Sequence, residues 1–169
     1  MSDLLDHFRQ ICGTAHVLTH EDPSTDLSAW ERDWRKRAQG RALAVVRPAN
    51  VQEVSEVVKA CAKAKISIVP QGGNTGLAVG SIPDDSGQQV VLSLQRMNKI
   101  RSLDAANLTV IAEAGCILQQ VQTHVEEAGY LFPLSLAAEG SCTLGGNLGT
   151  NAGGTQVVRF GNTRELCLG

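Results

Sequence analysis

Two glycine-rich segments, far apart in the sequence, constrain most strongly what this chain can fold into. The first runs from Pro70 to Gly76 (PQGGNTG) and the second from Gly140 to Gly154 (GSCTLGGNLGTNAGG). Because glycine lacks a Cβ atom, a ligand can approach the peptide amides of such segments closely. A small inorganic phosphate needs one loop of this kind. Two loops, separated by enough chain for several strands and a helix, favour a long phosphate-bearing cofactor such as a dinucleotide.

Length and composition exclude several classes of protein. The 169 residues suffice for one domain with a hydrophobic core and are fewer than a typical two-domain oxidoreductase needs. With 43% hydrophobic and 19% charged residues, the chain has the composition of a soluble globular protein, and no apolar run approaches the roughly 20 residues that span a bilayer. The net charge of -2 provides no broad cationic surface for nucleic acid. We therefore expect neither a membrane span nor a nucleic-acid partner.

Cysteine and histidine spacing argues against a metal site. The five cysteines include no C-x-x-C pair, which disfavours both a zinc site and a redox dithiol and indicates reduced thiols. The four histidines include no H-x-x-H pair, and His124 falls on a predicted helix, where a polar surface role is expected. The first residues carry Asp3 and Asp6 where a secretory or mitochondrial signal would carry basic residues. The sequence thus predicts a cytoplasmic protein with no metal.

The first half of the chain shows the pattern of a strand, a crossover helix and a second strand. Apolar spacing predicts a helix over 3–12, then an irregular arm over 16–28, then Trp30 and Trp34 on one helical face. A strand over 42–46 is followed by a helix capped by Asn50 with Glu53 as its reciprocal partner. The predicted buried stripe of that helix contains Val51, Val54, Val57, Val58 and Cys61. A strand over 66–69, terminated by Pro70, should run parallel to the first.

The second half of the chain is predicted to contain short strands and a further helix. Strands are predicted over 89–94 and 108–113, the latter from its alternation of apolar and polar residues. A helix follows, with its apolar face formed by Ile117, Leu118, Val121 and Val125 and its end at Gly129. The segment over 161–169 ends as an apolar run begins, which is typical of the start of a strand. We expect an N-terminal helical and irregular arm over 1–38 and a ligand-binding domain over 39–169.

The first glycine segment has the composition of an anion-binding loop. Successive amides in a loop with three glycines can converge on a pyrophosphate, and Asn74 and Thr75 add short polar side chains. The alternative is an ordinary glycine turn. Neither segment contains G-x-G-x-x-G, and no Lys-Ser or Lys-Thr pair follows a glycine at P-loop spacing. A Rossmann site and a kinase-type site are therefore not supported.

The second glycine segment is the more specific of the two. Its glycines alternate with threonine and asparagine, so the run can wrap a flat heteroaromatic ring while its amides and side chains bond the edge of that ring. The alternative is a flexible linker, but Leu144, Leu148 and Ala152 recur at a spacing that linkers seldom keep. Cys142 lies within this segment, and a small packed thiol is the preferred interpretation over a reactive one.

Taken together, these segments resemble the FAD-binding domain of the vanillyl-alcohol oxidase type, and within it the branch of D-2-hydroxyglutarate and D-lactate dehydrogenases, which includes proteins like the FAD-linked component of glycolate oxidase. The resemblance extends from about Asp33 to Gly169. Beyond the two glycine segments it is carried by Gly40-Arg41, Val46-Arg47-Pro48, Arg96-Met97-Asn98, Ala114-Gly115-Cys116 and Phe160-Gly161. It implies an α+β, PCMH-type FAD-binding fold with a small parallel βαβ lobe and a second, mixed or antiparallel lobe, incomplete at the C-terminus.

The resemblance also implies which residues bind the cofactor. In that family the first loop holds the FAD pyrophosphate, and the second segment runs along the ribityl chain and the flavin. The implied phosphate-binding residues are Gly72, Gly73, Asn74, Thr75 and Gly76. The implied residues for the remainder of FAD are Pro133, Gly140, Ser141, Thr143, Gly146, Asn147, Asn151, Gly153 and Gly154. Relatives that attach FAD covalently carry a histidine in the first loop, where this chain has Asn74, so the expected FAD is non-covalent.

The function implied by the resemblance is oxidation of a D-2-hydroxy acid, of the 2-hydroxyglutarate, lactate or glycolate class, by hydride transfer to flavin. A quinone or an electron-transfer flavoprotein would accept the electrons. The catalytic and metal-binding residues of the family lie mainly in a later substrate domain, so none is expected here and this piece alone should be inactive. A non-catalytic nucleotide-binding module of the same fold is the main alternative. An FAD-dependent reductase of cell-wall precursor synthesis shares the fold, but its glycine loop fits this chain less well.

Overall fold

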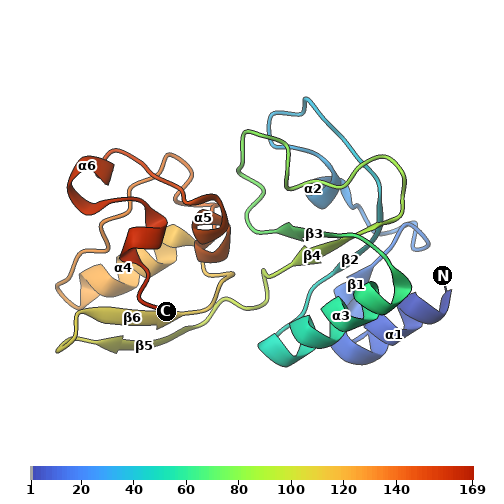
Figure 1. The fold of residues 1–169 in the computed structure, drawn as a ribbon, viewed down its shortest axis with the longest axis horizontal. Coiled ribbons are helices and arrows are strands. Elements are labelled where there is room, and N and C mark those ends of the chain that lie inside the picture. The colour runs from blue at the N-terminus through green and yellow to red at the C-terminus, as the bar shows by residue number, and fades with distance from the viewer. Residues whose placement is uncertain (1) are drawn as a thin grey trace. The chain divides into compact units, whose positions relative to one another are not determined.

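The computed structural model describes residues 2–169, which divide into two compact units, Met1–Arg96 and Met97–Gly169 (Figure 1). The first unit contains α1 (Ser2–Cys12), a 3-10 turn (Thr14–His16), β1 (Val17–Leu18), α2 (Ser28–Glu31), β2 (Ala42–Val46), α3 (Val51–Ala64), β3 (Ile68–Gln71) and β4 (Gln89–Ser93). The second contains β5 (Ile100–Asp104), β6 (Thr109–Ala112), α4 (Leu118–Glu127), α5 (Leu144–Thr150), α6 (Val157–Phe160) and a 3-10 turn (Thr163–Leu166). The expected combination of a parallel lobe and a more antiparallel lobe is confirmed.

The sheet of the first unit has the order β1-β2-β4-β3. β2 and β3 each pair in parallel with β4, while β1 pairs antiparallel with β2. The predicted parallel strands are therefore parallel, but β4 lies between them. The segment over 16–28 was predicted to be irregular. This prediction was wrong at Val17 and Leu18, which form β1. A two-residue strand is too short to show a period, so its pairing partner, and not its own sequence, defines it.

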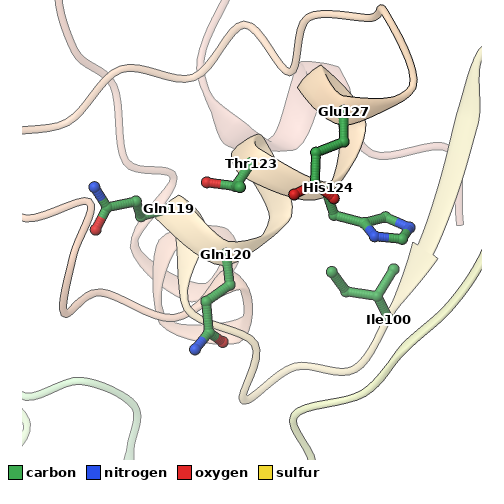
Figure 2. Close-up of a pocket in the computed structure, with 6 residues that line it drawn as sticks. All are labelled: Ile100, Gln119, Gln120, Thr123, His124 and Glu127. Carbon is green, nitrogen blue, oxygen red and sulfur yellow. The ribbon is translucent and has the colours of Figure 1, made fainter.

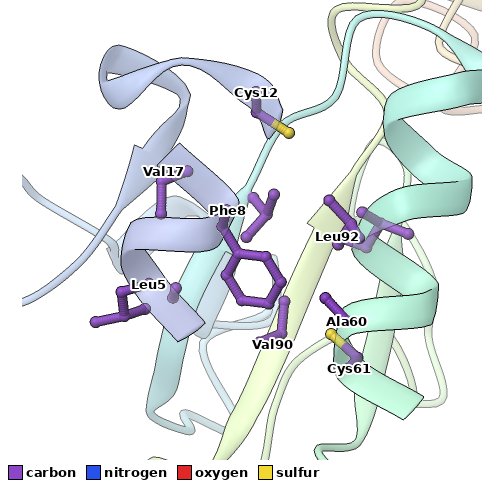
Figure 3. Close-up of a cluster of buried hydrophobic side chains, with 11 residues drawn as sticks. Leu5, Phe8, Cys12, Val17, Ala60, Cys61, Val90 and Leu92 are labelled. Atoms are coloured by element: carbon purple, nitrogen blue, oxygen red, sulfur yellow. The ribbon is translucent and has the colours of Figure 1, made fainter. Parts of the chain in front are cut away.

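The N-terminal helix belongs to the core of this unit. α1 packs against α3, and Phe8 is fully buried among side chains of β4 and α3 that include Val90 and Cys61 (Figure 3). The predicted arm over 1–38 thus contributes a helix and a strand to the first unit, and its boundary with the ligand-binding domain at residue 39 stays a prediction.

The helix α3 is capped as expected. Asn50 accepts a hydrogen bond from the Glu53 amide at 2.9 Å, and the Glu53 carboxylate accepts one from the Ala49 amide at 2.8 Å. The buried stripe was wrong in two places, since Val51 is 67% and Val58 42% exposed. These two residues are seven positions apart and so share one line of the helix, which faces away from the stripe centred on Val57 and Cys61.

Two further strand and helix predictions need correction. Pro70 lies inside β3, paired with Leu92, instead of ending the strand. The sheet tolerates it because β3 is an edge strand, where one missing N–H can face away from the neighbouring strand. Trp30 and Trp34 do not share a helix, because α2 ends at Glu31. Asp33 instead accepts hydrogen bonds from the amides of Arg37 and Ala38, each at 2.7 Å, and this turn redirects the chain and leaves Trp34 54% exposed.

The second unit has a hairpin of β5 and β6 packed against α4. The predicted strand over 108–113 is confirmed for 109–112, and its partner β5 was missed. The helix end at Gly129 is confirmed, with φ of 84° at that glycine. The strand expected near the C-terminus is wrong, because Asn162 and Glu165 form a capping box that starts a 3-10 turn. Among residues 2–169, no helix is long and apolar enough to cross a bilayer.

Candidate functional site: the two glycine segments

The first glycine segment begins inside β3, and its residues 72–76 follow the strand at the carboxyl edge of the parallel strands. Residues 72–75 are half-buried and Gly76 is exposed. Ligands of open α/β sheets bind beyond the carboxyl ends of parallel strands, where the chain leaves the sheet and its amides lose their ladder partners. The position of the loop therefore agrees with a binding role.

The amides of this loop are free to bind a ligand. Within the described part of the first unit, residues 2–96, no protein acceptor is hydrogen-bonded to the amides of Gly72, Gly73, Asn74, Thr75 and Gly76. Asn74 has φ of 53°, in the left-handed region. A run of unpaired amides with a left-handed residue has the geometry of an anion-binding nest. These residues therefore fit the diphosphate of a dinucleotide.

Hydrogen bonds of three side chains, Gln71, Asn74 and Ser81, fix the conformation of this loop. Gln71 donates through Nε2 to the carbonyl oxygens of Trp30, at 2.8 Å, and Ser81, at 2.7 Å. Asn74 donates through Nδ2 to the carbonyl oxygen of Arg32 at 2.8 Å, and its Oδ1 accepts from the Ser81 hydroxyl at 2.8 Å. Both polar atoms of the Asn74 side chain are thus hydrogen-bonded within the protein. Only the backbone amide of Asn74 is free to bind a ligand. Gln71 and Ser81 were missed by the sequence interpretation because their partners are distant in the chain.

The second glycine segment is not an extended loop that could wrap around a ligand. Its centre forms the helix α5, which begins after Thr143, whose hydroxyl accepts from the Gly146 amide at 3.4 Å. The amides of Leu144 and Gly145 donate to the carbonyl oxygens of Cys116, at 2.9 Å, and Ala114, at 2.7 Å. The preference for a compact segment over a flexible linker is thus confirmed. The helix was missed because glycine has the lowest helix propensity after proline.

Two of the predicted ligand residues are buried in this unit. Thr143 and Asn147 are each 4% exposed, and Asn147 donates through Nδ2 to the Cys142 sulfur at 3.4 Å. Burial raises the pKa of the Cys142 thiol. A neutral, buried thiol is a packed side chain and a poor nucleophile, which confirms the interpretation of Cys142.

Two glycines of the segment, Gly153 and Gly154, allow close packing, whereas Gly149 does not serve that purpose. A Cβ atom at Gly154 would lie 1.6 Å from the carbonyl oxygen of Ser135, and one at Gly153 would lie 2.1 Å from Oδ1 of Asn162. A Cβ atom at Gly149 would meet nothing within 4 Å. Gly153 and Gly154, which are expected to let a ligand approach, therefore also have a packing reason to be glycine.

The remaining predicted residues surround these elements. Pro133 is half-buried, whereas Gly140 and Ser141 are exposed in the turn that precedes Thr143. Asn151 adopts a left-handed conformation with φ of 51° and accepts from the Arg164 amide at 3.0 Å. Arg164 also donates to the carbonyl oxygens of Leu148, at 3.0 Å, and Gly149, at 2.8 Å, so it caps the C-terminus of α5.

A shallow depression on α4 shares no residue with the predicted site. It is lined by Ile100, Gln119, Gln120, Thr123, His124 and Glu127 (Figure 2). Its polar side chains lie on the exposed face of the helix, as expected for His124. Among the described residues, no group of three or more histidine, cysteine or acidic side chains could hold a metal ion.

Comparison with known proteins relates this chain to flavoproteins. The profile of the FAD binding domain family matches residues 42–169. The chain is 37% identical over 163 residues to mitochondrial D-2-hydroxyglutarate dehydrogenase of Arabidopsis thaliana, covering 96% of this chain and 28% of that protein. It is 41% identical over 144 residues to D-2-hydroxyglutarate dehydrogenase of Xanthomonas citri pv. viticola, covering 85% and 30%. A putative mitochondrial D-lactate dehydrogenase of Schizosaccharomyces pombe is 40% identical over 166 residues, covering 96% and 31%.

Solved structures show the same fold. An alkyldihydroxyacetonephosphate synthase superposes with a TM-score of 0.86 at 18% identity, over 99% of this chain and 32% of that one. p-Cresol methylhydroxylase superposes with a TM-score of 0.67 at 25% identity, over 90% and 29%. The chain thus spans less than a third of the length of the relatives described above. The solved structures show a PCMH-type FAD-binding fold, and the match over residues 42–169 shows that the chain belongs to the FAD binding domain family.

Proposed function

We propose that this chain is the FAD-binding part of a flavin-dependent dehydrogenase that oxidises a D-2-hydroxy acid. The observation that carries the proposal is 37% to 41% identity to proteins named D-2-hydroxyglutarate dehydrogenase, across 85% to 96% of this chain. The identity of 40% to a putative D-lactate dehydrogenase supports the same substrate class, a small acid with a hydroxyl group beside its carboxylate. A quinone or an electron-transfer flavoprotein is the proposed electron acceptor.

The proposed role of the first loop is to hold the two phosphates of FAD. Unpaired amides at residues 72–76 can donate to phosphate oxygens, and such bonds to a charged acceptor are stronger than those between neutral groups. Gln71 and Asn74 hold the loop in one conformation before the cofactor arrives, which lowers the entropic cost of binding. When bound, the flavin supplies the acceptor for a hydride.

The proposed role of the second segment is to bind the ribityl and flavin part of FAD. The proposed residues are Pro133, Gly140, Ser141, Thr143, Gly146, Asn147, Asn151, Gly153 and Gly154. Three observations support a rigid surface there: the Thr143 cap of α5, the burial of Asn147, and the tight approach of Gly154 to Ser135. A surface that does not reorganise can hold a flat ring without a further entropic cost.

We also propose that FAD is bound non-covalently and that the protein is cytoplasmic. Asn74 stands where covalent relatives of the family carry a histidine, and Cys142 is buried with a raised pKa, so neither provides a ready nucleophile. The scattered free cysteines support a reducing compartment.

The proposed activity is tested with the protein expressed from its full reading frame. The expected preparation shows flavin absorbance that bleaches under anaerobic conditions when D-2-hydroxyglutarate, D-lactate or glycolate is added one at a time. The L-isomers of the first two acids serve as matched controls and should leave the absorbance unchanged. A flavin-loaded protein that bleaches with none of these acids would exclude the dehydrogenase and favour a non-catalytic nucleotide-binding module.

A further inference from the structure

The turn that follows α2 exposes its basic side chains and buries its acidic ones. Glu31 is 4% and Asp33 3% exposed. The exposed basic residues of the turn are Arg32, Arg35, Lys36 and Arg37. Nε of Arg37 lies 3.9 Å from the Asp33 carboxylate, and the other three form no ion pair within residues 2–96. Opposite charges that alternate in the sequence are thus separated in space, and the surface of the turn is positive.

The buried Asp33 fixes the shape of this turn. Its carboxylate accepts hydrogen bonds from the amides of Arg35, at 3.2 Å, and of Arg37 and Ala38, each at 2.7 Å. Lys36 adopts a left-handed conformation, with φ of 58°, and its amide donates to the Asp33 carbonyl oxygen at 2.8 Å. These amides, that of Ala38 foremost, lower the pKa of Asp33, so its carboxylate is charged at neutral pH. A turn held in this way presents its side chains at a low entropic cost of ordering.

Two large apolar side chains are exposed beside these charges. Trp34 is 54% and Leu77 58% exposed. The Arg35 guanidinium lies 5.1 Å from the centroid of the Trp34 ring, and Arg37 donates through NH2 to the carbonyl oxygen of Leu77 at 3.0 Å. Neither 32–41 nor 72–83 carries an exposed acidic side chain. Exposed apolar side chains among basic ones are typical of surfaces that enter the headgroup region of an anionic membrane.

The small size of this surface favours a bilayer over a protein partner. A stable protein interface takes about 20–30 residues from each side. Among residues 2–96, the other exposed large apolar side chains are Val51 and Val58, which belong to α3. A bilayer needs fewer contacts, because each basic residue near an anionic surface raises the binding constant about fivefold.

We propose that this surface binds reversibly to phospholipid bilayers with anionic headgroups. Its residues, together called the basic patch, are Trp34, Arg35, Lys36, Arg37 and Leu77. The basic side chains meet the lipid phosphates, and the indole and the leucine enter the headgroup region. Such binding brings the protein to electron acceptors dissolved in a membrane. The inference goes beyond the proposed function and does not depend on it.

The first test measures sedimentation of the full chain with vesicles of phosphatidylglycerol and phosphatidylcholine in equal parts. The protein should pellet with these vesicles at low ionic strength, leave them at high ionic strength, and ignore vesicles of phosphatidylcholine alone. Arg35→Gln combined with Lys36→Gln should weaken binding about 20-fold. Lys59→Gln combined with Lys63→Gln removes the same charge from exposed positions of α3 and should bind as the wild type does.

The second test measures tryptophan emission, which reports on the indole of the basic patch. The difference between the wild type and Trp34→Phe isolates the emission of Trp34, which should shift to shorter wavelength with anionic vesicles. No pelleting of the wild type, equal pelleting of the two double variants, or an unchanged Trp34 emission would overturn the proposal. A shift with polyglutamate and with neither vesicle would also overturn it, and would indicate an acidic protein partner. Flavin content and bleaching by substrate should be the same in all variants, so they test the proposed function separately.

Discussion

Replacing Gly73 with valine is expected to yield a folded protein that purifies without flavin. The β-branched side chain would stand within the run of five unpaired amides and would keep a phosphate from reaching them. Losing two charge-assisted hydrogen bonds would weaken FAD binding about 100-fold or more. The measurement is the ratio of flavin absorbance to protein absorbance in the purified full chain, together with the dissociation constant of FAD for the apo form.

The matched control for this variant is Gly80→Val. A Cβ atom at Gly80 would meet nothing within 4 Å, and Gly80 lies outside the run of free amides. This control should retain flavin at the level of the wild type. If Gly73→Val does not fold, Gly73→Ala tests the same contact with a smaller side chain. A Gly73→Val protein as yellow as the wild type would contradict the role of the loop.

The second large effect is expected from Gly154→Ala, which should destabilise the protein by about 3 kcal/mol or more. The added methyl group would lie 1.6 Å from the carbonyl oxygen of Ser135 and 3.2 Å from a side-chain carbon of Leu136. The backbone cannot move away cheaply, because Thr163 donates through its amide, at 3.0 Å, to the carbonyl oxygen of the nearby Ala152. The urea midpoint of the purified protein is the measurement.

Gly149→Ala, in the same segment, is expected to change the stability of the protein in the opposite direction. Gly149 lies within α5, where a Cβ atom meets nothing within 4 Å, so alanine should stabilise the protein by up to about 1 kcal/mol through helix propensity. Equal urea midpoints for the two alanine variants would show that the segment is loosely packed. That result would remove the argument that the second segment offers the cofactor a rigid surface.

The parallel lobe could be predicted largely from sequence because its signals are local. The strand over 42–46, the Asn50 cap and the strand near 89–93 each depend on residues within a few positions of one another. The insertion of β4 between β2 and β3 could not be predicted, because strand order is set by packing between distant segments. β5 was missed for a related reason: its residues are mostly exposed and show no apolar alternation.

For the candidate site, the sequence indicated the positions of the glycine loops better than their conformations. The loop at 72–76 could be located because glycine and asparagine favour left-handed backbone, as found at Asn74. The side chains that fix it, Gln71 and Ser81, depend on contacts that no spacing reveals. The role assigned to each predicted cofactor residue stays a prediction, as does the cytoplasmic location.

Hydrogen exchange of the amides at residues 72–76 tests the central claim most directly. These amides lack protein acceptors within their own unit, so in the apo form of the full chain they should exchange rapidly. Addition of FAD should slow their exchange about tenfold or more, because each amide that donates to a phosphate oxygen is protected. Exchange rates that are the same with and without bound FAD would show that the cofactor is held elsewhere and would contradict the account.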